Sequence, residues 1–324
     1  MKAIVCQELG PPEKLVYTEV KDPPMGPGEV RIAVKGAGVN FPDTLIIQGK
    51  YQMKAAPPFT PGAEVAGTVL AAGDKVKHVK PGDTVVALVP VGGFAEQVVA
   101  SGDGVMALPA GMDPVAAAGF ALAYGTSMHA LKQRAHLQPG ETLLVLGAAG
   151  GVGLSAVQIG KLMGARVIAA ASSPEKLALC KEQGADELID YSKESLKEAV
   201  KKLTKGQGAD VIYDPVGGPL AQDCLSAINW NGRYLVIGFV GGGIPEIATN
   251  RLLLKGAAAV GVFWGAFVAR EPKVNAQNIQ QLYAWVSSGQ LKPYVSKTYP
   301  LAQAAQALRD MMERKVTGKV VLTT

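Results

Sequence analysis

Cysteine and histidine are scarce in this sequence. Its 324 residues contain three of each. Cys6, Cys180 and Cys224 stand far apart and form no Cys-x-x-Cys pair, which argues against a disulfide framework and against a zinc cluster of neighbouring cysteines. We therefore expect structural thiols in a reducing compartment, the cytoplasm.

An excess of one charge and a long apolar run are also lacking. The net charge of +5 is modest and not concentrated in any segment, which gives little support to nucleic acid or an anionic membrane as the main partner. The longest apolar run, residues 257–269, is interrupted by glycine and falls short of the roughly 20 residues of a membrane span. The segment MKAIVCQELG predicts a strand and not a signal peptide, so we expect a soluble protein.

The sequence does contain a pattern that predicts a strand, a glycine-rich turn and a helix in succession. The strand and the turn lie in residues 142–153 (TLLVLGAAGGVG), and an apolar pattern of helical spacing follows. This is the context of a dinucleotide-binding fingerprint, in which glycines admit a pyrophosphate to the backbone at a helix N-terminus. A purely structural turn of small residues is the alternative. The predicted cofactor contacts in this stretch are Ala148, Gly150, Gly151, Val152 and Gly153.

The predicted secondary-structure pattern changes along the chain. Residues 1 to about 120 are rich in short strands separated by Pro-Gly and Gly-Asp turns, which favours a compact barrel or sandwich. From Thr142 strands alternate with helices, which predicts an α/β fold with a doubly wound parallel sheet. After about residue 265 the alternation ends.

The motifs together resemble the medium-chain dehydrogenase/reductase family, specifically its zinc-free NADPH:quinone oxidoreductase branch, the zeta-crystallin-like proteins. The resemblance implies a GroES-like, β-rich catalytic domain made from both chain ends, residues 1–122 and 266–324, with a Rossmann domain over residues 123–265. The motifs that carry it are GVNFPD (38–43), QGKY (48–51), PFTPGAEVAGTV (58–69), KPGDTVVAL (80–88), GGFAEQVV (92–99), GAAGGVG (147–153), GADVIYDPVGG (208–218) and IGFVGG (237–242).

The positions that match zinc ligands in the metal-dependent branch of this family do not hold ligands here. Asn40 stands where those enzymes have a cysteine, and Ala63 where they have a histidine. The cysteine-rich structural-zinc lobe is missing as well. Because zinc requires thiolate, imidazole or carboxylate ligands, we expect no metal.

The end of the second strand of the expected Rossmann sheet bears on the choice of cofactor. NAD enzymes place an acid there, whereas this chain has Ser172 and Ser173, with Lys176 in the next turn, which suits a 2′-phosphate and predicts NADPH. A helix cap at Ser173 is the structural alternative. The resemblance implies 2′-phosphate contacts from Ser172, Lys176, Tyr191 and Lys315, with the neighbouring Arg314 as the alternative to Lys315.

Without a metal, hydrogen-bond donors must stabilise the acceptor oxygen during hydride transfer. The resemblance implies Asn40, Tyr51 and Thr126 for this role; a turn residue at Asn40 and a loop anchor at Tyr51 are the structural alternatives. We expect four residues beyond the fifth and sixth strands to frame the nicotinamide and the acceptor, with core packing as the alternative: Phe239, Val240, Phe263 and Trp264.

The resemblance implies NADPH-dependent reduction of quinones. Reduction of 2-alkenals, enones or enoyl thioesters is the near alternative, because these acceptors are also conjugated and electron-poor. A non-catalytic NADPH-binding protein that binds RNA is a more distant one, since no basic patch interleaved with aromatic residues is present. The apolar sixth strand, residues 257–264, would form a sheet edge, so we expect a homodimer.

Overall fold

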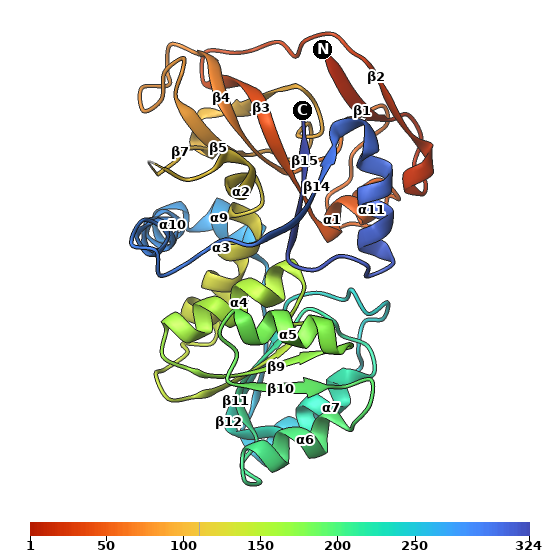
Figure 1. Ribbon diagram of the computed structural model, residues 1–324, viewed down its shortest axis with the longest axis vertical. Coiled ribbons are helices and arrows are strands. Elements are labelled where there is room, and N and C mark those ends of the chain that lie inside the picture. Colours follow the sequence, from red (N-terminus) through yellow and green to blue (C-terminus); the bar gives the residue numbers. More distant parts are fainter. Residues whose placement is uncertain (110) are drawn as a thin grey trace. The chain divides into compact units, whose positions relative to one another are not determined.

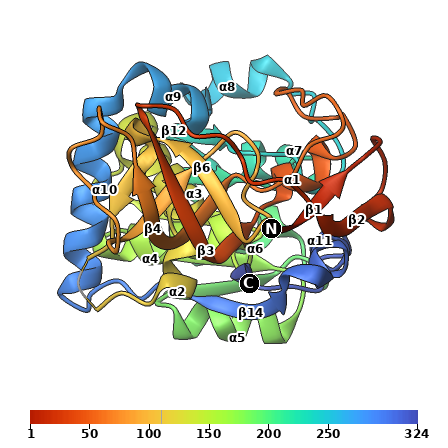
Figure 2. The same ribbon diagram turned by 90° about the horizontal axis from the view of Figure 1, so that it is seen from above.

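The computed structural model describes residues 1–109 and 111–324 and divides the chain into two units (Figure 1). Unit 1 comprises Met1–Leu122 and Lys292–Thr324, and unit 2 comprises Ala123–Leu291. Both chain ends therefore belong to unit 1, as Figures 1 and 2 also show.

The boundary at which the chain returns to unit 1 lies after Leu291. The sequence interpretation placed this boundary earlier, between residues 265 and 266. Helix α10 (Pro272–Ser287) packs against α9 (Trp264–Arg270). The indole Nε1 of Trp264 donates a hydrogen bond of 3.2 Å to Oδ1 of Asn275. Both helices thus share the core of unit 2.

Unit 1 is built on a seven-stranded sheet in the order β14-β15-β3-β4-β5-β7, with β6 paired to β3. Its C-terminal strand β15 lies antiparallel to β3 and parallel to β14. A two-stranded sheet of β1 and β2 adjoins it. The strands are β1 (Lys2–Cys6), β2 (Leu15–Glu19), β3 (Glu29–Val39), β4 (Glu64–Ala72), β5 (Thr84–Leu88), β6 (Gln97–Ser101), β7 (Val105–Ala107), β14 (Val295–Pro300) and β15 (Lys319–Thr323). The helices are α1 (Phe41–Ile46), α2 (Pro114–Ala118) and α11 (Ala304–Met312).

Unit 2 is built on a six-stranded sheet in the order β10-β9-β8-β11-β12-β13, and every pairing in it is parallel. The strands are β8 (Thr142–Leu146), β9 (Arg166–Ala171), β10 (Glu187–Asp190), β11 (Ala209–Asp214), β12 (Ile228–Val236) and β13 (Ala258–Gly261). Among its helices are α4 (Gly151–Leu162), α5 (Pro174–Glu182), α6 (Leu196–Leu203), α7 (Leu220–Ser226) and α8 (Thr249–Lys255); α3 (Ala121–His129) begins at the boundary of the units.

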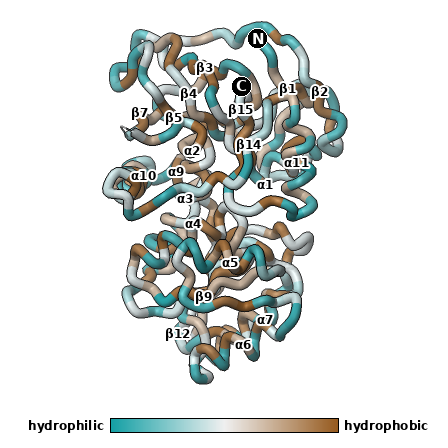
Figure 3. Tube along the Cα trace, viewed as in Figure 1, coloured by the Kyte–Doolittle hydropathy of each residue, from teal (hydrophilic) through white to brown (hydrophobic). Residues whose placement is uncertain are grey.

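Helices cover both faces of this parallel sheet. Figure 1 shows α4 and α5 on one side and α6 and α7 on the other. The central strands β8 and β9 are buried over almost their whole length, and the strands of unit 2 include long apolar stretches, drawn in brown in Figure 3. Continuous apolar strands of this kind are stable only when both faces are covered. The predicted doubly wound sheet is confirmed.

The sixth strand is shorter than predicted. The sequence indicated a strand over residues 257–264, whereas β13 ends at Gly261 and α9 begins at Trp264. The pattern misled because a short apolar run does not distinguish a strand from the start of a buried helix. Across the described residues, none of the helices has both the length and the apolarity needed to cross a bilayer.

Candidate functional site

The glycine turn after β8 has the tight geometry that its sequence predicts. Gly147 adopts a φ of 53°, in the left-handed region that favours glycine. A Cβ atom added at Gly153 would lie 2.3 Å from the carbonyl oxygen of Gly147 and 2.8 Å from Cα of Ala148. Because both neighbours are backbone atoms, only glycine fits at position 153 without a shift of the turn.

The turn leads into a helix start that suits an anion. Helix α4 is 12 residues long, and its N-cap residue is Gly150, which has no side chain to cap it. The first N–H groups of a helix have no carbonyl of a preceding turn to bind, and the helix dipole adds partial positive charge there. Gly151 and Val152 are partly exposed, so this end of α4 can receive a phosphate group.

A hydroxyl cluster holds α3 against this helix start. The Ser127 hydroxyl lies 2.9 Å from the carbonyl oxygen of Val152, 2.8 Å from Oγ of Ser155 and 2.8 Å from the hydroxyl of Tyr213. Burial raises the pKa of Tyr213, so this phenol stays neutral. Thr126, the residue before Ser127, is partly exposed. The cluster therefore positions Thr126 close to the first turn of α4.

A buried carboxylate shapes the loop after β11. Oδ1 of Asp214 accepts hydrogen bonds from the backbone N–H groups of Val216 (2.7 Å) and Gly217 (2.9 Å), and Oδ2 accepts one from the Tyr234 hydroxyl (2.5 Å). Burial raises the pKa of Asp214 despite these hydrogen bonds. Three donors to one side chain fix the loop at the carboxyl edge of the sheet.

The predicted nicotinamide residues have different surroundings. Val240 donates from its backbone N–H to the Pro215 carbonyl oxygen at 3.1 Å, which places residues 239–240 beside the loop after β11. Phe263 is exposed, so core packing does not account for it. Trp264 is buried against α3, where a Cβ atom at Gly125 would lie 2.5 Å from its ring.

Ser172 and Tyr191 lie next to each other at the carboxyl edge of the sheet. They follow the neighbouring strands β9 and β10, and the backbone N–H of Tyr191 donates to the Ala171 carbonyl oxygen at 3.2 Å. Ser173 caps α5, because its Oγ accepts from the backbone N–H of Lys176 at 3.4 Å. The structural alternative for Ser173 is thus correct, and it leaves Ser172 and Lys176 beside a second helix start.

An acid at this edge of the sheet is already paired with its own neighbours. Asp190 ends β10, and its carboxylate accepts from the hydroxyl of Ser192 at 2.6 Å and lies 3.4 Å from Nζ of Lys193. These contacts, the Ser192 hydrogen bond foremost, lower the pKa of Asp190. Lys315, the last predicted contact of the 2′-phosphate, belongs to unit 1, where its ammonium pairs with Glu313 at 2.5 Å.

In unit 1, Asn40 belongs to a buried polar cluster. Its Nδ2 donates to Oε1 of Glu64 at 2.9 Å and to the Gly38 carbonyl oxygen at 3.2 Å. Its Oδ1 accepts from Nζ of Lys319 at 2.5 Å, and the same ammonium lies 2.8 Å from Oε1 of Glu64. The Asn40 amide is thus already committed within the protein, which does not fit a direct donor to an acceptor molecule.

Asp43, in helix α1, lies next to the polar cluster of Asn40. Its Oδ2 accepts from the backbone N–H of Asn40 at 2.8 Å, while its Oδ1 has no hydrogen-bond partner among the described residues. Complete burial raises the pKa of Asp43 to about 7. Burial, and then the charge of Asp43, raise the pKa of the partly buried Tyr51. Tyr51 is therefore a neutral phenol and can donate a hydrogen bond.

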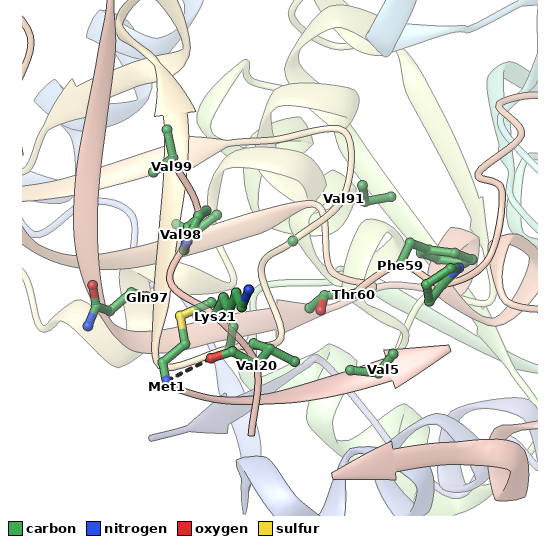
Figure 4. A pocket seen from close by; sticks show the side chains of 14 residues that line it. Met1, Val5, Val20, Lys21, Phe59, Thr60, Val91, Gln97, Val98 and Val99 are labelled. Atoms are coloured by element: carbon green, nitrogen blue, oxygen red, sulfur yellow. Dashed lines mark hydrogen bonds between the residues drawn. The ribbon is translucent and has the colours of Figure 1, made fainter. Parts of the chain in front are cut away.

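A pocket of unit 1 with a volume of about 400 Å³ lies elsewhere (Figure 4). It is lined mostly by apolar side chains, among them Val5, Phe59 and Val98. The N-terminal amine of Met1 donates to the Val20 carbonyl oxygen at its rim, at 3.0 Å. None of its lining residues is a predicted site residue.

Known proteins match both units of the chain. The alcohol dehydrogenase GroES-like domain matches residues 26–110, and the zinc-binding dehydrogenase domain matches residues 151–284. A quinone oxidoreductase-like protein 2 homolog of Nematostella vectensis is 40% identical over 326 residues, which covers 100% of this chain and 89% of that protein. The chain belongs to the medium-chain dehydrogenase/reductase family.

Two solved structures of this family are similar over almost their whole length. The Escherichia coli quinone oxidoreductase complexed with NADPH has a TM-score of 0.93 at 28% identity, and all of both chains is covered. The CurK enoyl reductase has a TM-score of 0.89 at 28% identity, with 99% of this chain and 98% of that chain covered. The predicted combination of a GroES-like domain and a Rossmann-like parallel sheet is confirmed.

The name of the second matching domain raises the question of zinc. Asn40 and Ala63 stand at the positions of two zinc ligands, and neither an amide nor a methyl group belongs to the ligand set that zinc prefers. Among the described residues, no group of three or more His, Cys, Asp or Glu side chains is placed to hold a metal ion. The Lys319 ammonium also lies within 3 Å of the side-chain oxygens of Asn40 and Glu64, and it would repel a cation bound there. The residues therefore do not fit zinc.

Sequence reasoning missed several residues of these clusters. Glu64 and Asp43 stand inside the motifs PGAEVAG and GVNFPD, so their proximity to Asn40 gave a signal. Lys319 gave none, because 279 positions separate it from Asn40. Ser127 adjoins the predicted Thr126, but a serine in an apolar helix does not indicate a hydroxyl cluster by itself.

Proposed function

We propose that this chain is an NADPH-dependent quinone oxidoreductase that works without a metal. The observation that carries the proposal is the glycine turn into α4, where Gly153 permits the tight turn and the helix start offers backbone donors to a pyrophosphate. The similarity to quinone oxidoreductases, one of them complexed with NADPH, supports the choice of cofactor and acceptor.

Three parts of the chain would bind the cofactor. Ala148 and the residues Gly150 to Gly153 would receive the pyrophosphate. Ser172, Lys176 and Tyr191 would receive the 2′-phosphate; their common edge of the sheet supports this, whereas Lys315 rests on the resemblance alone. The residues proposed to frame the nicotinamide are Thr126, Phe239, Val240, Phe263 and Trp264.

NADPH, when bound, supplies the hydride; the chain orients the reactants and stabilises the charge that develops on the acceptor oxygen. We propose Tyr51 as the hydrogen-bond donor to this oxygen on the strength of the family resemblance, since a neutral phenol can donate through its O–H. Asn40 would act indirectly, because its amide is engaged with Lys319 and Glu64. It would hold the N-terminus of α1, which carries Asp43, in position.

Reduction of an activated carbon–carbon double bond is the second candidate. The similarity to the CurK enoyl reductase favours it. Hydride transfer to an enone or enoyl thioester needs the same two features, a bound NADPH and a hydrogen-bond donor to the acceptor oxygen. A panel of quinones, 2-alkenals, enones and acyl-CoA thioesters, assayed with NADPH and NADH, separates the two. The proposed function predicts the highest kcat/KM with a quinone and NADPH. Turnover of an enoyl thioester alone would replace it by the second candidate, and no NADPH oxidation with any acceptor would refute both.

We also propose a homodimer located in the cytoplasm. Strand β13 ends the sheet order of unit 2, and the exposed large apolar side chains of the same unit include Trp230 (64%), Leu253 (80%) and Leu254 (72%). Exposed apolar side chains and a free sheet edge suit an isologous contact with a second copy. All three cysteines are free and buried, which supports a reducing compartment.

The domain limits are proposed to follow the contacts of the chain. The catalytic domain would comprise residues 1–122 and 292–324, and the cofactor domain residues 123–291. The shift from the expected limit at 265 reflects the packing of α10 on α9.

A further inference from the structure

The ammonium group of Lys319 is fully coordinated by oxygen atoms. Nζ lies 2.5 Å from Oδ1 of Asn40, 2.8 Å from Oε1 of Glu64 and 3.2 Å from the Val39 carbonyl oxygen. A lysine ammonium has three N–H donors, and each has one acceptor here. The Lys319 side chain is only 5% exposed and the Glu64 side chain is not exposed at all, so the protein itself supplies this coordination.

The three oxygen acceptors belong to a rigid frame. Val39 ends β3, Asn40 precedes α1, Glu64 begins β4, and Lys319 begins β15. Strands β15, β3 and β4 are neighbours in one sheet. The pairing of these strands sets the positions of the three oxygen acceptors before any ligand is considered.

Glycines line the space in which this group lies. A Cβ atom at Gly38 would lie 2.3 Å from Oε1 of Glu64, and one at Gly119 would lie 3.1 Å from Cβ and 3.2 Å from Cε of Lys319. The lysine side chain therefore runs through a closely fitting channel. Shortening it to alanine would leave a void of the shape of n-propylammonium, which contains the four atoms removed.

The negative charge of the Glu64 carboxylate also makes this frame suitable for a cation. Oε2 of Glu64 accepts from the backbone N–H of Leu122 at 2.9 Å, and Oε1 faces Asn40 and Lys319. Without the ammonium, a fully buried carboxylate would remain without a cation. A buried charge that loses its partner is strongly destabilising, whereas a carboxylate, an amide oxygen and a carbonyl oxygen together form a typical hard-cation donor set.

We propose that the Lys319 ammonium is a tethered cation that fills a cation site formed by Val39, Asn40 and Glu64, and that a primary alkylammonium ion can replace it when the side chain is removed. The site holds the end of β3, the start of α1 and the start of β4 together with β15. The chain thus carries its own cation at the Asn40 position. This inference is independent of the proposed function, since it concerns the stability of the frame.

Lys319→Ala with added n-propylammonium chloride tests the inference. We expect the variant to melt roughly 6 °C or more below the unaltered protein. n-Propylammonium should raise its melting temperature along a saturating curve, and tetramethylammonium chloride of equal concentration should not, because it has no N–H donor. Lys35→Ala, which removes an exposed lysine of β3, is the matched control and should not respond. Equal effects of the two salts on Lys319→Ala, or no effect of either, would overturn the proposal.

Two further variants keep the test decisive if Lys319→Ala does not fold alone. Refolding it with either salt gives the same comparison, and recovery of folded protein with n-propylammonium only is the expected result. Lys319→Met removes the charge but fills the void, so it should be destabilised, should not respond to n-propylammonium, and should regain stability when combined with Glu64→Gln. A Lys319→Met variant as stable as the unaltered protein would refute the need for a cation.

Discussion

At the scale of single residues, the chemistry of this protein depends on which polar atoms are already occupied. From the sequence alone, Asn40 is expected to donate a hydrogen bond to the acceptor molecule. Its amide has three partners within the protein, which do not support this direct role. Tyr51 and Lys176 are the two residues for which we propose contacts with ligands. Three predictions belong to this scale.

Replacing Lys176 with alanine should weaken NADPH more than NADH, because only NADPH presents a 2′-phosphate. A charge-assisted hydrogen bond contributes about 1.5–3 kcal/mol, so NADPH affinity should fall at least about tenfold while NADH affinity changes little. Fluorescence titration with both cofactors measures this. Lys202→Ala, on the exposed side of α6, serves as the control. Equal losses for the two cofactors would make Lys176 a structural residue of α5.

Tyr51→Phe keeps the ring and removes only the phenolic donor. Enals and enones develop an enolate at the acceptor oxygen, so their kcat should fall by about 2–4 kcal/mol of barrier, roughly 30- to 1000-fold. Ortho-quinones accept electrons more readily, so their turnover should fall much less, and NADPH affinity should stay unchanged. Steady-state kinetics with both acceptor classes tests this. A fall in NADPH affinity as large as the loss of rate would assign Tyr51 to the cofactor loop instead.

Asp43 should make the protein less stable as the pH rises. Its pKa of about 7 in the folded protein is above the ordinary value of 3.8, so between about pH 4 and 7 the folded state binds the proton that the unfolded state has released. The contribution of Asp43 to the free energy of unfolding is therefore complete below about pH 4 and falls progressively between about pH 4 and pH 7. At about 1.4 kcal/mol for each tenfold change, the loss is about 4 kcal/mol at most.

Asp43→Asn removes this titration and keeps an oxygen that can accept from the Asn40 N–H. The melting temperature of Asp43→Asn relative to the unaltered protein should therefore rise between pH 5 and pH 7.5. Asp74→Asn, at an exposed position of the same unit, is the control. Parallel pH curves for Asp43→Asn and the unaltered protein would contradict the prediction.

At the scale of elements, the turn from β8 to α4 depends on backbone contact rather than on side chains. A methyl group at Gly153 would press on the Gly147 carbonyl at 2.3 Å, so Gly153→Ala must shift the turn and the first N–H groups of α4. We expect NADPH affinity to fall at least about tenfold, since loss of even one hydrogen bond to a charged group has this effect. Isothermal calorimetry with NADPH checks it.

Gly28→Ala is the control for Gly153→Ala. No atom lies within 4 Å of a Cβ atom added there, so the substitution should leave cofactor binding unaltered. An NADPH affinity of Gly153→Ala equal to that of the control would show that the turn tolerates the methyl group and that its glycine is not needed for the cofactor.

At the scale of the whole molecule, the exposed apolar side chains of unit 2 predict association of two chains. Leu253→Asp combined with Leu254→Asp places charges where the proposed contact needs apolar surface, so the dimer should dissociate at micromolar concentration. Sedimentation velocity distinguishes the two states. Leu70→Asp, at an exposed position of β4 in unit 1, should leave the dimer intact. An unaltered protein that sediments as a monomer would refute the dimer.

The sequence by itself determined the fold class and the cofactor turn of this protein. Both depend on local order along the chain. Apolar runs that alternate with helical patterns require a covered parallel sheet, and the glycines between residues 147 and 153 permit the tight turn before the helix. These features could be predicted because each one is decided by residues within a few positions of one another.

The tertiary structure alone decided the state of the residues around Asn40. The pairing of β15 with β3 brings Lys319 to Asn40 and Glu64, and burial then makes any unpaired charge there unfavourable. Burial in unit 1 also gives Asp43 its raised pKa, and the packing of α3 on α4 in unit 2 sets the Ser127 hydroxyl against Val152. Local patterns could not indicate these contacts, because hydrogen bonding and desolvation depend on neighbours that are distant in the chain and are brought together only by folding.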